Sequence, residues 1–137
     1  MKDCNCIFCK IIGGEIPSNT IYEDEDFKVI LDVSPATKGH ALVLPKEHYR
    51  DLYEIEPEIL AKAVKVAQKV IKHQKKVLDC EGYNLLQNNG EVAGQTVFHF
   101  HMHLVPRYEN AKNILTWSHE TFSGEELKAL CEKMKMD

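Results

Sequence analysis

Histidines at alternate positions are the feature of this sequence that most clearly suggests chemistry. His99, His101 and His103 lie in the apolar stretch Gly94 to Pro106 and are three of the seven histidines in the chain. On a strand, residues two apart share a face, whereas on a helix these three would fan over roughly 200°. The spacing predicts a strand that ends near Pro106, which lacks a ladder donor, with the imidazoles on one face. The residues predicted to face the interior are Val97, Phe98, Phe100, Met102 and Leu104.

A row of imidazoles can bind a metal ion or attack an electrophile. At a rise of about 3.4 Å per residue, the Cα atoms of His99 and His103 lie about 13.5 Å apart, so all three rings reach one tetrahedral ion only with strain. At least one histidine is therefore free for other work. The middle residue, His101, is the natural nucleophile because its neighbours flank it. The alternative is a polar sheet face without a function.

The segment before the histidines suggests a binding site for phosphate. Gly90 and Gly94 let backbone N–H groups approach an anion, and Asn88, Gln95 and Thr96 add neutral donors. Phosphorus is therefore the electrophile that suits this neighbourhood. Taken alone, a loop of this composition between two strands is more often an ordinary hairpin turn.

A second candidate site lies near the N-terminus, where Cys6 and Cys9 form a C-x-x-C pair. This spacing fits two thiolates of a tetrahedral zinc site whose other two ligands come from elsewhere. Redox chemistry is the competing interpretation, but no evident helix start within a βαβ unit follows the motif. Five cysteines are poor evidence for disulfides in a reducing compartment. Cys80 and Cys131 are predicted to be small buried residues.

Bulk composition limits the possible functions. With 137 residues and 44% hydrophobic composition, the chain can form one domain with a substantial core. A net charge of -4 and a pI near 6.0, without a basic stripe, argue against a nucleic-acid polymer as partner. No targeting segment or membrane span is evident, so the sequence predicts a cytoplasmic protein with no membrane partner.

The elements that must position these residues follow an α+β pattern. Strands are predicted at Thr20–Glu23, Phe27–Val33, His40–Pro45 and Tyr83–Gln87, followed by the histidine strand. A long helix is predicted from Pro57 to Leu78, and Ser123 with Glu126 forms a capping box before a short C-terminal helix. The predicted core stripe of the long helix is Ile59, Leu60, Ala63, Val64, Ala67, Val70, Ile71, Val77 and Leu78.

The stretch "HFHMHLV" matches the signature of the histidine triad (HIT) superfamily, and "NNGEVAGQTVFHFHMHLVPR" resembles its Hint branch of nucleotidyl hydrolases. "FKVILDVSPATKGHALVLPKEH" is similar to the same branch, so the resemblance covers roughly Cys6 to Arg107. It implies a single HIT-like domain over residues 1–137, with a core at 6–107 and a C-terminal extension at 108–137. It also implies a five-stranded antiparallel sheet and a homodimer in which two sheets run on into one another.

The resemblance implies a role for each matched residue. His101 falls on the covalent nucleophile, His103 on the residue that contacts phosphate near the leaving group, and His40 on a histidine behind the triad. Asp32 matches the acidic residue that binds the ribose hydroxyls. The phosphate-site positions fall on Asn88, Gln95 and Thr96, where threonine replaces the commoner serine. Without the match, Asp32 would read as a solvated residue and His40 as a structural one.

The resemblance also implies a zinc site. In bacterial-type members, a C-x-x-C pair joins another histidine and the first triad histidine, which correspond here to Cys6, Cys9, His48 and His99. Four protein ligands leave no open position for an activated water, so a structural zinc is expected and no catalytic metal is required.

The function implied is hydrolysis of nucleoside 5'-phosphoramidates, or related activated purine mononucleotides, through a nucleotidyl-histidine intermediate. Three alternatives remain open: a dinucleoside polyphosphate hydrolase of the same superfamily, a zinc-dependent hydrolase that uses the His-x-His pair as ligands, and a nucleotide-binding scaffold with vestigial activity. Candidate walls of the purine slot are Ile7, Phe8, Ile11, Phe27 and Leu31.

Overall fold

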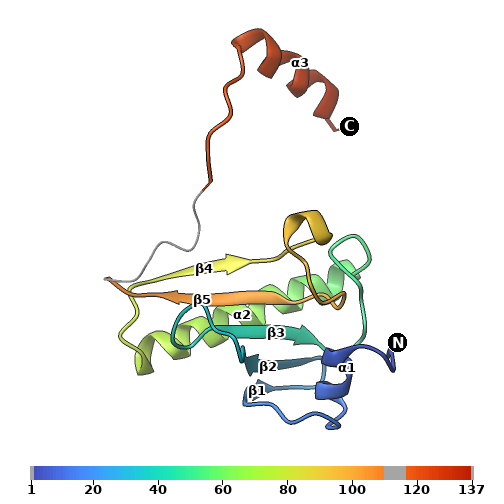
Figure 1. Cartoon of the computed structure of the whole chain (residues 1–137), viewed down its shortest axis with the longest axis vertical. Helices are drawn as coiled ribbons and strands as arrows, with labels where there is room; N and C mark the ends of the chain where they lie inside the picture. The colour runs from blue at the N-terminus through green and yellow to red at the C-terminus, as the bar shows by residue number, and fades with distance from the viewer. Residues whose placement is uncertain (1, 110–116, 137) are drawn as a thin grey trace.

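The computed structural model describes residues 2–109 and 117–136, and within these residues one antiparallel sheet has the spatial order β1-β2-β3-β5-β4 (Figure 1). Its strands are β1 (Thr20–Glu23), β2 (Phe27–Leu31), β3 (Ala41–Pro45), β4 (Gly82–Leu86) and β5 (Met102–Arg107). The helical elements are α1 (Ile7–Ile12), α2 (Pro57–Val77), the 3-10 turn η1 (Glu91–Ala93) and α3 (Gly124–Met134). The predicted α+β fold is confirmed, and its strands agree within one or two residues apart from β5. Residues 110–116 of the predicted C-terminal extension lie outside the described residues.

The long helix α2 covers one face of the sheet and forms the main core with it. Val29, Val43 and Leu104 alternate along three neighbouring strands and are fully buried beneath the helix. Alternation of this kind sends every second side chain to the same face. The helix contributes Ala63, Val66, Ala67 and Val70.

The short helix α1 covers part of the other face, where Phe8 and Ile11 pack on Ile30, Leu42 and Leu44. Because β3 is central and covered on both sides, all of its residues are buried. His103 pairs with Leu42 across the β3–β5 ladder, so it lies on this second face. The sheet thus separates the apolar core under α2 from a face on which α1 and the histidines meet.

The predicted histidine strand needs two corrections. The ladder begins only at Met102, because Gly94 is left-handed and the backbone of Phe100 donates to the carbonyl of Tyr49 instead of to a strand. Pro106 does not end the strand, since it pairs with Tyr83 and the strand runs on to Arg107. Its missing N–H is tolerated because the β3 ladder has already ended opposite Leu104, on the side that Pro106 faces. Phe98, predicted to face the interior, is 39% exposed.

Helix α1 was not predicted from the sequence. It begins directly after Cys6, inside the C-x-x-C pair, and the Sγ of Cys6 caps it by accepting the N–H of Cys9. It is not, however, part of a βαβ unit, since the sheet is antiparallel throughout the described residues. Six residues are too few to show a helical apolar period.

The core stripe of α2 also differs in part from its prediction. Val64 and Val77 are 46% and 63% exposed, whereas Val66 and Gln74 are buried. Val64 lies one residue, or 100°, away from the buried stripe, and Val77 is the last residue of the helix. Gln74 is therefore a polar residue on the core side, and its partners are described below.

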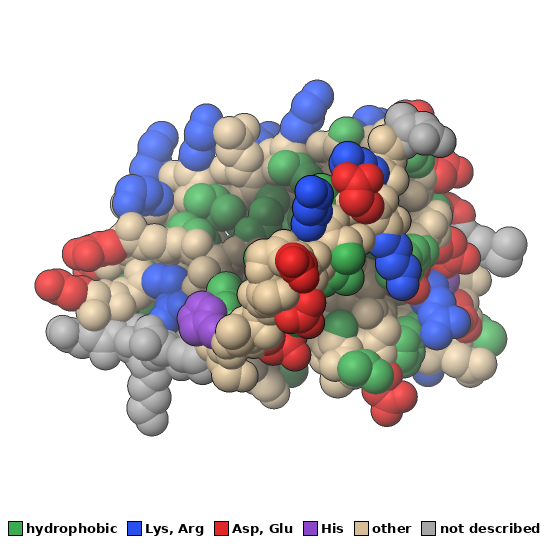
Figure 2. All heavy atoms as spheres, turned by 90° about the horizontal axis from the view of Figure 1, so that it is seen from above, with side chains coloured by type: hydrophobic (Ala, Val, Ile, Leu, Met, Phe, Trp, Pro, Cys, Tyr) green, Lys and Arg blue, Asp and Glu red, His purple; other side chains and the backbone are tan. Residues whose placement is uncertain are grey.

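Surface features complete the fold. Helix α3 begins with the predicted capping box of Ser123 and Glu126 and lies apart from the sheet, so Cys131 is exposed and not buried as predicted, while Cys80 is buried (Figure 1). In Figure 2 several Lys and Arg side chains lie along the upper edge, and others lie among Asp and Glu side chains on the rest of this face. Exposed lysines recur along α2, so the expected absence of a basic stripe is wrong, although the predicted absence of a nucleic-acid partner remains a prediction. Of the described helices, none is long and apolar enough to cross a bilayer.

Candidate functional site

His101 is buried, and among the described residues no hydrogen bond is formed by one of its ring nitrogens, Nε2. Its Nδ1 lies 2.7 Å from the carbonyl oxygen of His99, so Nδ1 carries the proton and Nε2 carries a lone pair. Burial lowers the pKa of His101, although the His99 carbonyl and the charge of Asp32 act in the opposite direction. The ring packs edge-on against Phe8, with 5.0 Å between ring centroids. A neutral imidazole with a fixed Nδ1 proton is what a nitrogen nucleophile requires.

His103 and His40 form a hydrogen-bonded pair beside it. The Nε2 of His40 lies 2.9 Å from the Nδ1 of His103 and 3.6 Å from Oδ2 of Asp32, while the backbone N–H of Ala36 donates to Nδ1 of His40 over 3.0 Å. Burial lowers the pKa of His40, and burial together with its histidine neighbours lowers the pKa of His103 to about 4. Both rings are therefore neutral at pH 7.

Asp32, His40 and His103 lie close enough to hold a metal ion, with ligand atoms within 4.8 Å of one another. The hydrogen bond from Ala36 argues against this use. Because Nδ1 of His40 accepts that bond, the ring proton lies on Nε2, which is the nitrogen that would have to bind the metal. Asp32, His40 and His103 are instead suited to form hydrogen bonds with a substrate.

The neutral histidines predict loss of stability in acid. In an unfolded chain a histidine has a pKa near 6.5, well above the folded value for His103. As pH falls below about 6.5, the unfolded state takes up protons that the folded state does not, so stability falls until about pH 4. We expect the free energy of unfolding, measured by urea denaturation, to drop by about 1–3 kcal/mol across this range.

The variant His103→Asn should flatten that pH dependence, because it removes one of the groups that titrate. A matched control is His73→Asn, since His73 is exposed on α2 and its loss should leave the slope unchanged. Equal slopes for His103→Asn and the unmodified protein would contradict the assignment.

A cavity of about 240 Å³ opens beside His101 and His103. Its apolar lining includes Ile7, Phe8, Ile11 and Leu31, and its polar lining includes Asp32, Thr96, His101 and His103. Four of the five predicted purine-slot residues therefore line it, but Phe27 does not, because Phe27 lies in the core under α2. A pocket lined by both apolar and polar side chains suits a nucleotide.

The loop from Asn88 to Thr96 borders this cavity at Thr96. Gly94 has φ +96°, and a Cβ there would lie 3.7 Å from the side-chain nitrogen of Asn88, so the two residues are neighbours. The side chain of Gln95 is buried and fully occupied: it accepts from the N–H of Gly90 and donates to the carbonyls of Arg50 and Val97. Gln95 thus shapes the loop and has no N–H left to donate.

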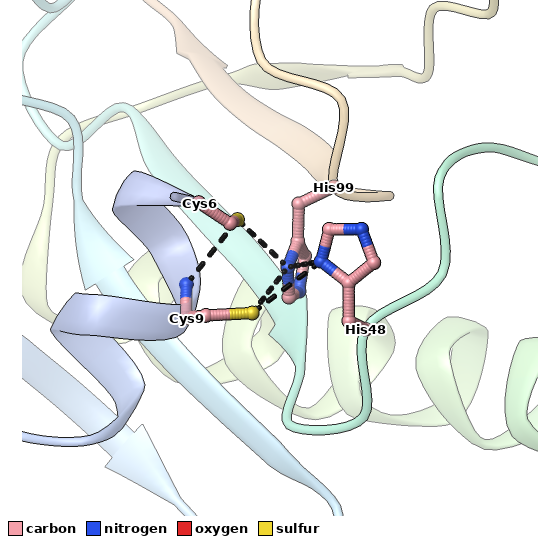
Figure 3. Close-up of side chains that lie close together, drawn as sticks. All are labelled: Cys6, Cys9, His48 and His99. Atoms are coloured by element: carbon pink, nitrogen blue, oxygen red, sulfur yellow. Dashed lines mark hydrogen bonds between the residues drawn. The ribbon is translucent and has the colours of Figure 1, made fainter. Parts of the chain in front are cut away.

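Cys6, Cys9, His48 and His99 form a separate cluster whose ligand atoms lie within 4.8 Å of one another (Figure 3). Around a tetrahedral zinc, bond lengths of about 2.3 Å to sulfur and 2.0–2.1 Å to nitrogen place S and N about 3.5 Å apart and two N atoms about 3.3 Å apart. The S–N separations here are 3.4, 3.3 and 3.6 Å, and the N–N separation is 3.2 Å. The cluster could therefore hold a tetrahedral metal ion.

His99 is oriented for that role. Its Nε2 donates to the carbonyl oxygen of Pro45 over 2.8 Å, which leaves the Nδ1 lone pair directed at the other ligand atoms. Burial lowers the pKa of His99 to about 4, so the ring is neutral, as a ligand must be. Burial raises the pKa of the Cys6 thiol, and a bound cation opposes this effect by favouring thiolate.

Several groups in both sites are main-chain atoms that sequence reasoning missed. The carbonyls of Pro45 and His99 and the N–H of Ala36 fix the positions of ring protons. No sequence signal identifies such groups, because every residue but proline offers the same donor and acceptor. The edge contact of Phe8 with His101 was missed for another reason, namely that helix α1 was not foreseen.

Comparison with known proteins places this architecture in a family. The HIT domain family matches residues 13–110. An adenosine 5'-monophosphoramidase of Schizosaccharomyces pombe is 40% identical over 131 residues, which cover 95% of this chain and 96% of that protein. A HIT family protein from Bacillus anthracis has a crystal structure that covers 96% of this chain and 95% of its own, with 45% identity and a TM-score of 0.87. A zinc-bound histidine triad family protein from Mycobacterium smegmatis is 39% identical, with 95% coverage of both chains and a TM-score of 0.76. The chain therefore belongs to the HIT domain family.

Proposed function

We propose that the protein hydrolyses nucleoside 5'-phosphoramidates, or related activated purine mononucleotides, with His101 as the covalent nucleophile. The observation that supports this most strongly is the state of His101: its Nδ1 proton is held by the His99 carbonyl, its Nε2 has no hydrogen-bond partner among the described residues, and the residue lines the cavity of about 240 Å³. The relative from Schizosaccharomyces pombe, named as an adenosine 5'-monophosphoramidase, supports this class of substrate.

The reaction has two steps. Nε2 of His101 attacks the α-phosphorus, the P–N bond breaks, and the leaving nitrogen takes up one proton as it departs as an amine. Water then attacks the same phosphorus, the P–Nε2 bond breaks, and one proton is released with the nucleoside monophosphate. Each half exchanges one bond to phosphorus, so His101 returns to its neutral state with the Nδ1 proton still in place.

Residues around the cavity bind the rest of the substrate. Asp32 would accept hydrogen bonds from the ribose hydroxyls, since a carboxylate can accept hydrogen bonds but has none to donate. The Nε2–H of His103, Thr96, Asn88 and the backbone of the loop would stabilise charge on the phosphoryl oxygens. Gln95 would act through the shape of that loop.

We further propose that Cys6, Cys9, His48 and His99 hold a structural zinc ion, which would tie α1 to the chain around His48 and His99. The tetrahedral separations and the zinc-bound relative support this assignment. The four ligands are protein side chains, so bound zinc would supply cross-linking and no activated water. The predicted homodimer remains a proposal as well, to be checked by light scattering after gel filtration.

Substrate preference tests the proposed function. We expect kcat/KM for adenosine 5'-phosphoramidate to exceed that for diadenosine tri- and tetraphosphate by at least about tenfold, because a cavity of this size holds one nucleotide. The reverse order would favour the dinucleoside polyphosphate hydrolase. Nucleotide binding with no turnover of either substrate would favour the scaffold.

A chelator distinguishes the zinc-dependent hydrolase. If folded protein stripped of metal keeps its nucleotidyl adduct on His101, the metal is not part of the reaction. An adduct that vanishes in step with the metal, while the fold persists, would favour metal-assisted hydrolysis.

A further inference from the structure

The turn between β2 and β3 contacts the pair of histidines through its main chain. The backbone N–H of Ala36 donates to Nδ1 of His40 over 3.0 Å, although the side chain of Ala36 is exposed and has no part in the site. A ring nitrogen that accepts a hydrogen bond carries no proton of its own. In a neutral ring, the single proton of His40 therefore lies on Nε2.

That proton decides the state of the next ring. Nε2 of His40 lies 2.9 Å from Nδ1 of His103, so Nδ1 accepts and the proton of His103 lies on its Nε2. Asp32, 3.6 Å from Nε2 of His40, favours the same arrangement. If both rings adopted the opposite tautomer, Nε2 of His103 would carry a lone pair and would repel a phosphoryl oxygen where it now offers a donor.

The turn itself is anchored from three elements. The side-chain amide of Gln74 in α2 donates from its nitrogen to the carbonyl of Gly39 over 2.9 Å. The hydroxyl of Tyr83 in β4 donates to the oxygen of that Gln74 amide over 2.8 Å and so holds it in place. Thr37 donates to the carbonyl of Pro106 in β5 over 2.7 Å. This explains the buried polar residue on the core side of α2: Gln74 fixes the turn. Gly39, with φ +92°, also fits closely against Leu78, where a Cβ would lie 2.7 Å from a side-chain carbon.

We propose that this turn, residues 34–40, is a tautomer lock for the catalytic histidines, and that the main-chain N–H of Ala36 is its positioning group. The lock makes His103 a hydrogen-bond donor towards the phosphoryl group. The inference rests on the proposed function, because the direction of the donor matters only if a phosphoryl group lies there.

An amide-to-ester exchange tests the lock. Incorporation of L-lactic acid at position 36 replaces the N–H by an oxygen and keeps the side chain. We expect kcat to fall at least about tenfold with KM changed less than about twofold, because a group that fixes an imidazole tautomer acts mainly on the chemical step. The ¹⁵N spectrum of the histidines should change in parallel, with His40 and His103 passing from one tautomer to a mixture.

Two controls isolate the N–H. Ala36→Ser keeps the main-chain amide and should retain both the kcat and the ¹⁵N spectrum. Gln74→Leu removes the bond that holds the turn but keeps the main-chain N–H of Ala36. It should therefore give a smaller loss of kcat with a partial tautomer change. Its fold is checked by circular dichroism.

The outcomes separate the lock from the reaction. If the unmodified protein forms the nucleotidyl adduct but the ester variant shows unchanged kcat and ¹⁵N shifts, the lock is wrong and the proposed function stands. If the unmodified protein forms no adduct and turns over no nucleotide, the proposed function fails, while the ¹⁵N spectra still decide whether Ala36 sets the tautomers.

Discussion

Replacement of His101 by alanine is expected to lower kcat for an adenosine phosphoramidate by at least about 10³-fold, because the chemistry then loses its nucleophile and retains only binding and charge stabilisation. The affinity for AMP, measured by calorimetry, should change less than about threefold, since a small neutral ring contributes little to ground-state binding. Mass spectrometry of samples quenched during turnover should find a nucleotide on the peptide that contains His101 in the unmodified protein and none in the variant.

The matched control for this variant is His73→Ala. His73 is an exposed histidine on α2, far in sequence from the triad and outside the lining of the nucleotide cavity, so its loss should leave kcat unchanged. Turnover by His101→Ala at more than about a tenth of the normal rate, or an adduct that maps to another residue, would overturn the role of His101.

The second large effect concerns the Cys/His cluster. Substitution of Cys9 by serine should abolish stoichiometric zinc binding and lower the free energy of unfolding by about 3 kcal/mol or more, because the ion binds only the folded arrangement of its ligands. For a domain of this size the melting temperature should fall by roughly 10 °C. Zinc content by plasma emission spectroscopy and thermal melts, with and without chelator, measure both effects.

Cys4→Ser provides the comparison, since Cys4 is exposed and lies outside the cluster. It should bind one zinc per chain and melt like the unmodified protein. A Cys9→Ser variant that kept one tightly bound zinc, or an unmodified protein whose melting temperature did not respond to chelator, would show that the cluster is not a structural metal site.

Much of the site follows from spacing and residue type. The alternation of His99, His101 and His103 correctly predicted that their rings lie on one side, since the ring of Phe8 contacts those of His99 and His101, and the ring of His103 adjoins that of His101. The strand itself begins only at Met102, after bends at residues 97–99. Likewise, the C-x-x-C pair and its two histidines do meet in space, as the resemblance implied. Side-chain chemistry that repeats along the chain can therefore be recognised from the order of the residues alone.

The rest depended on contacts that a linear pattern does not contain. Helix α1 is too short to show a period, and its cap is a cysteine, which is not a usual capping residue. Pro106 looked like a strand end because the sequence does not reveal where the neighbouring strand β3 stops. Gln74 and the N–H of Ala36 matter only because the fold brings them to one turn.

His99 belongs to both the Cys/His cluster and the site around His101. Its ring faces the cysteines, and its carbonyl holds the proton of His101. A substitution at position 99 keeps this carbonyl but removes the ring and its bond to Pro45, so it acts on His101 only through the position of the main chain. In a variant that already lacks Cys9, the same substitution should do less further damage to zinc binding than it does alone. Such sub-additive behaviour, known as epistasis, would couple the evolution of the cluster, through His99, to that of the nucleophile. A substitution in either site would limit which substitutions the other site tolerates.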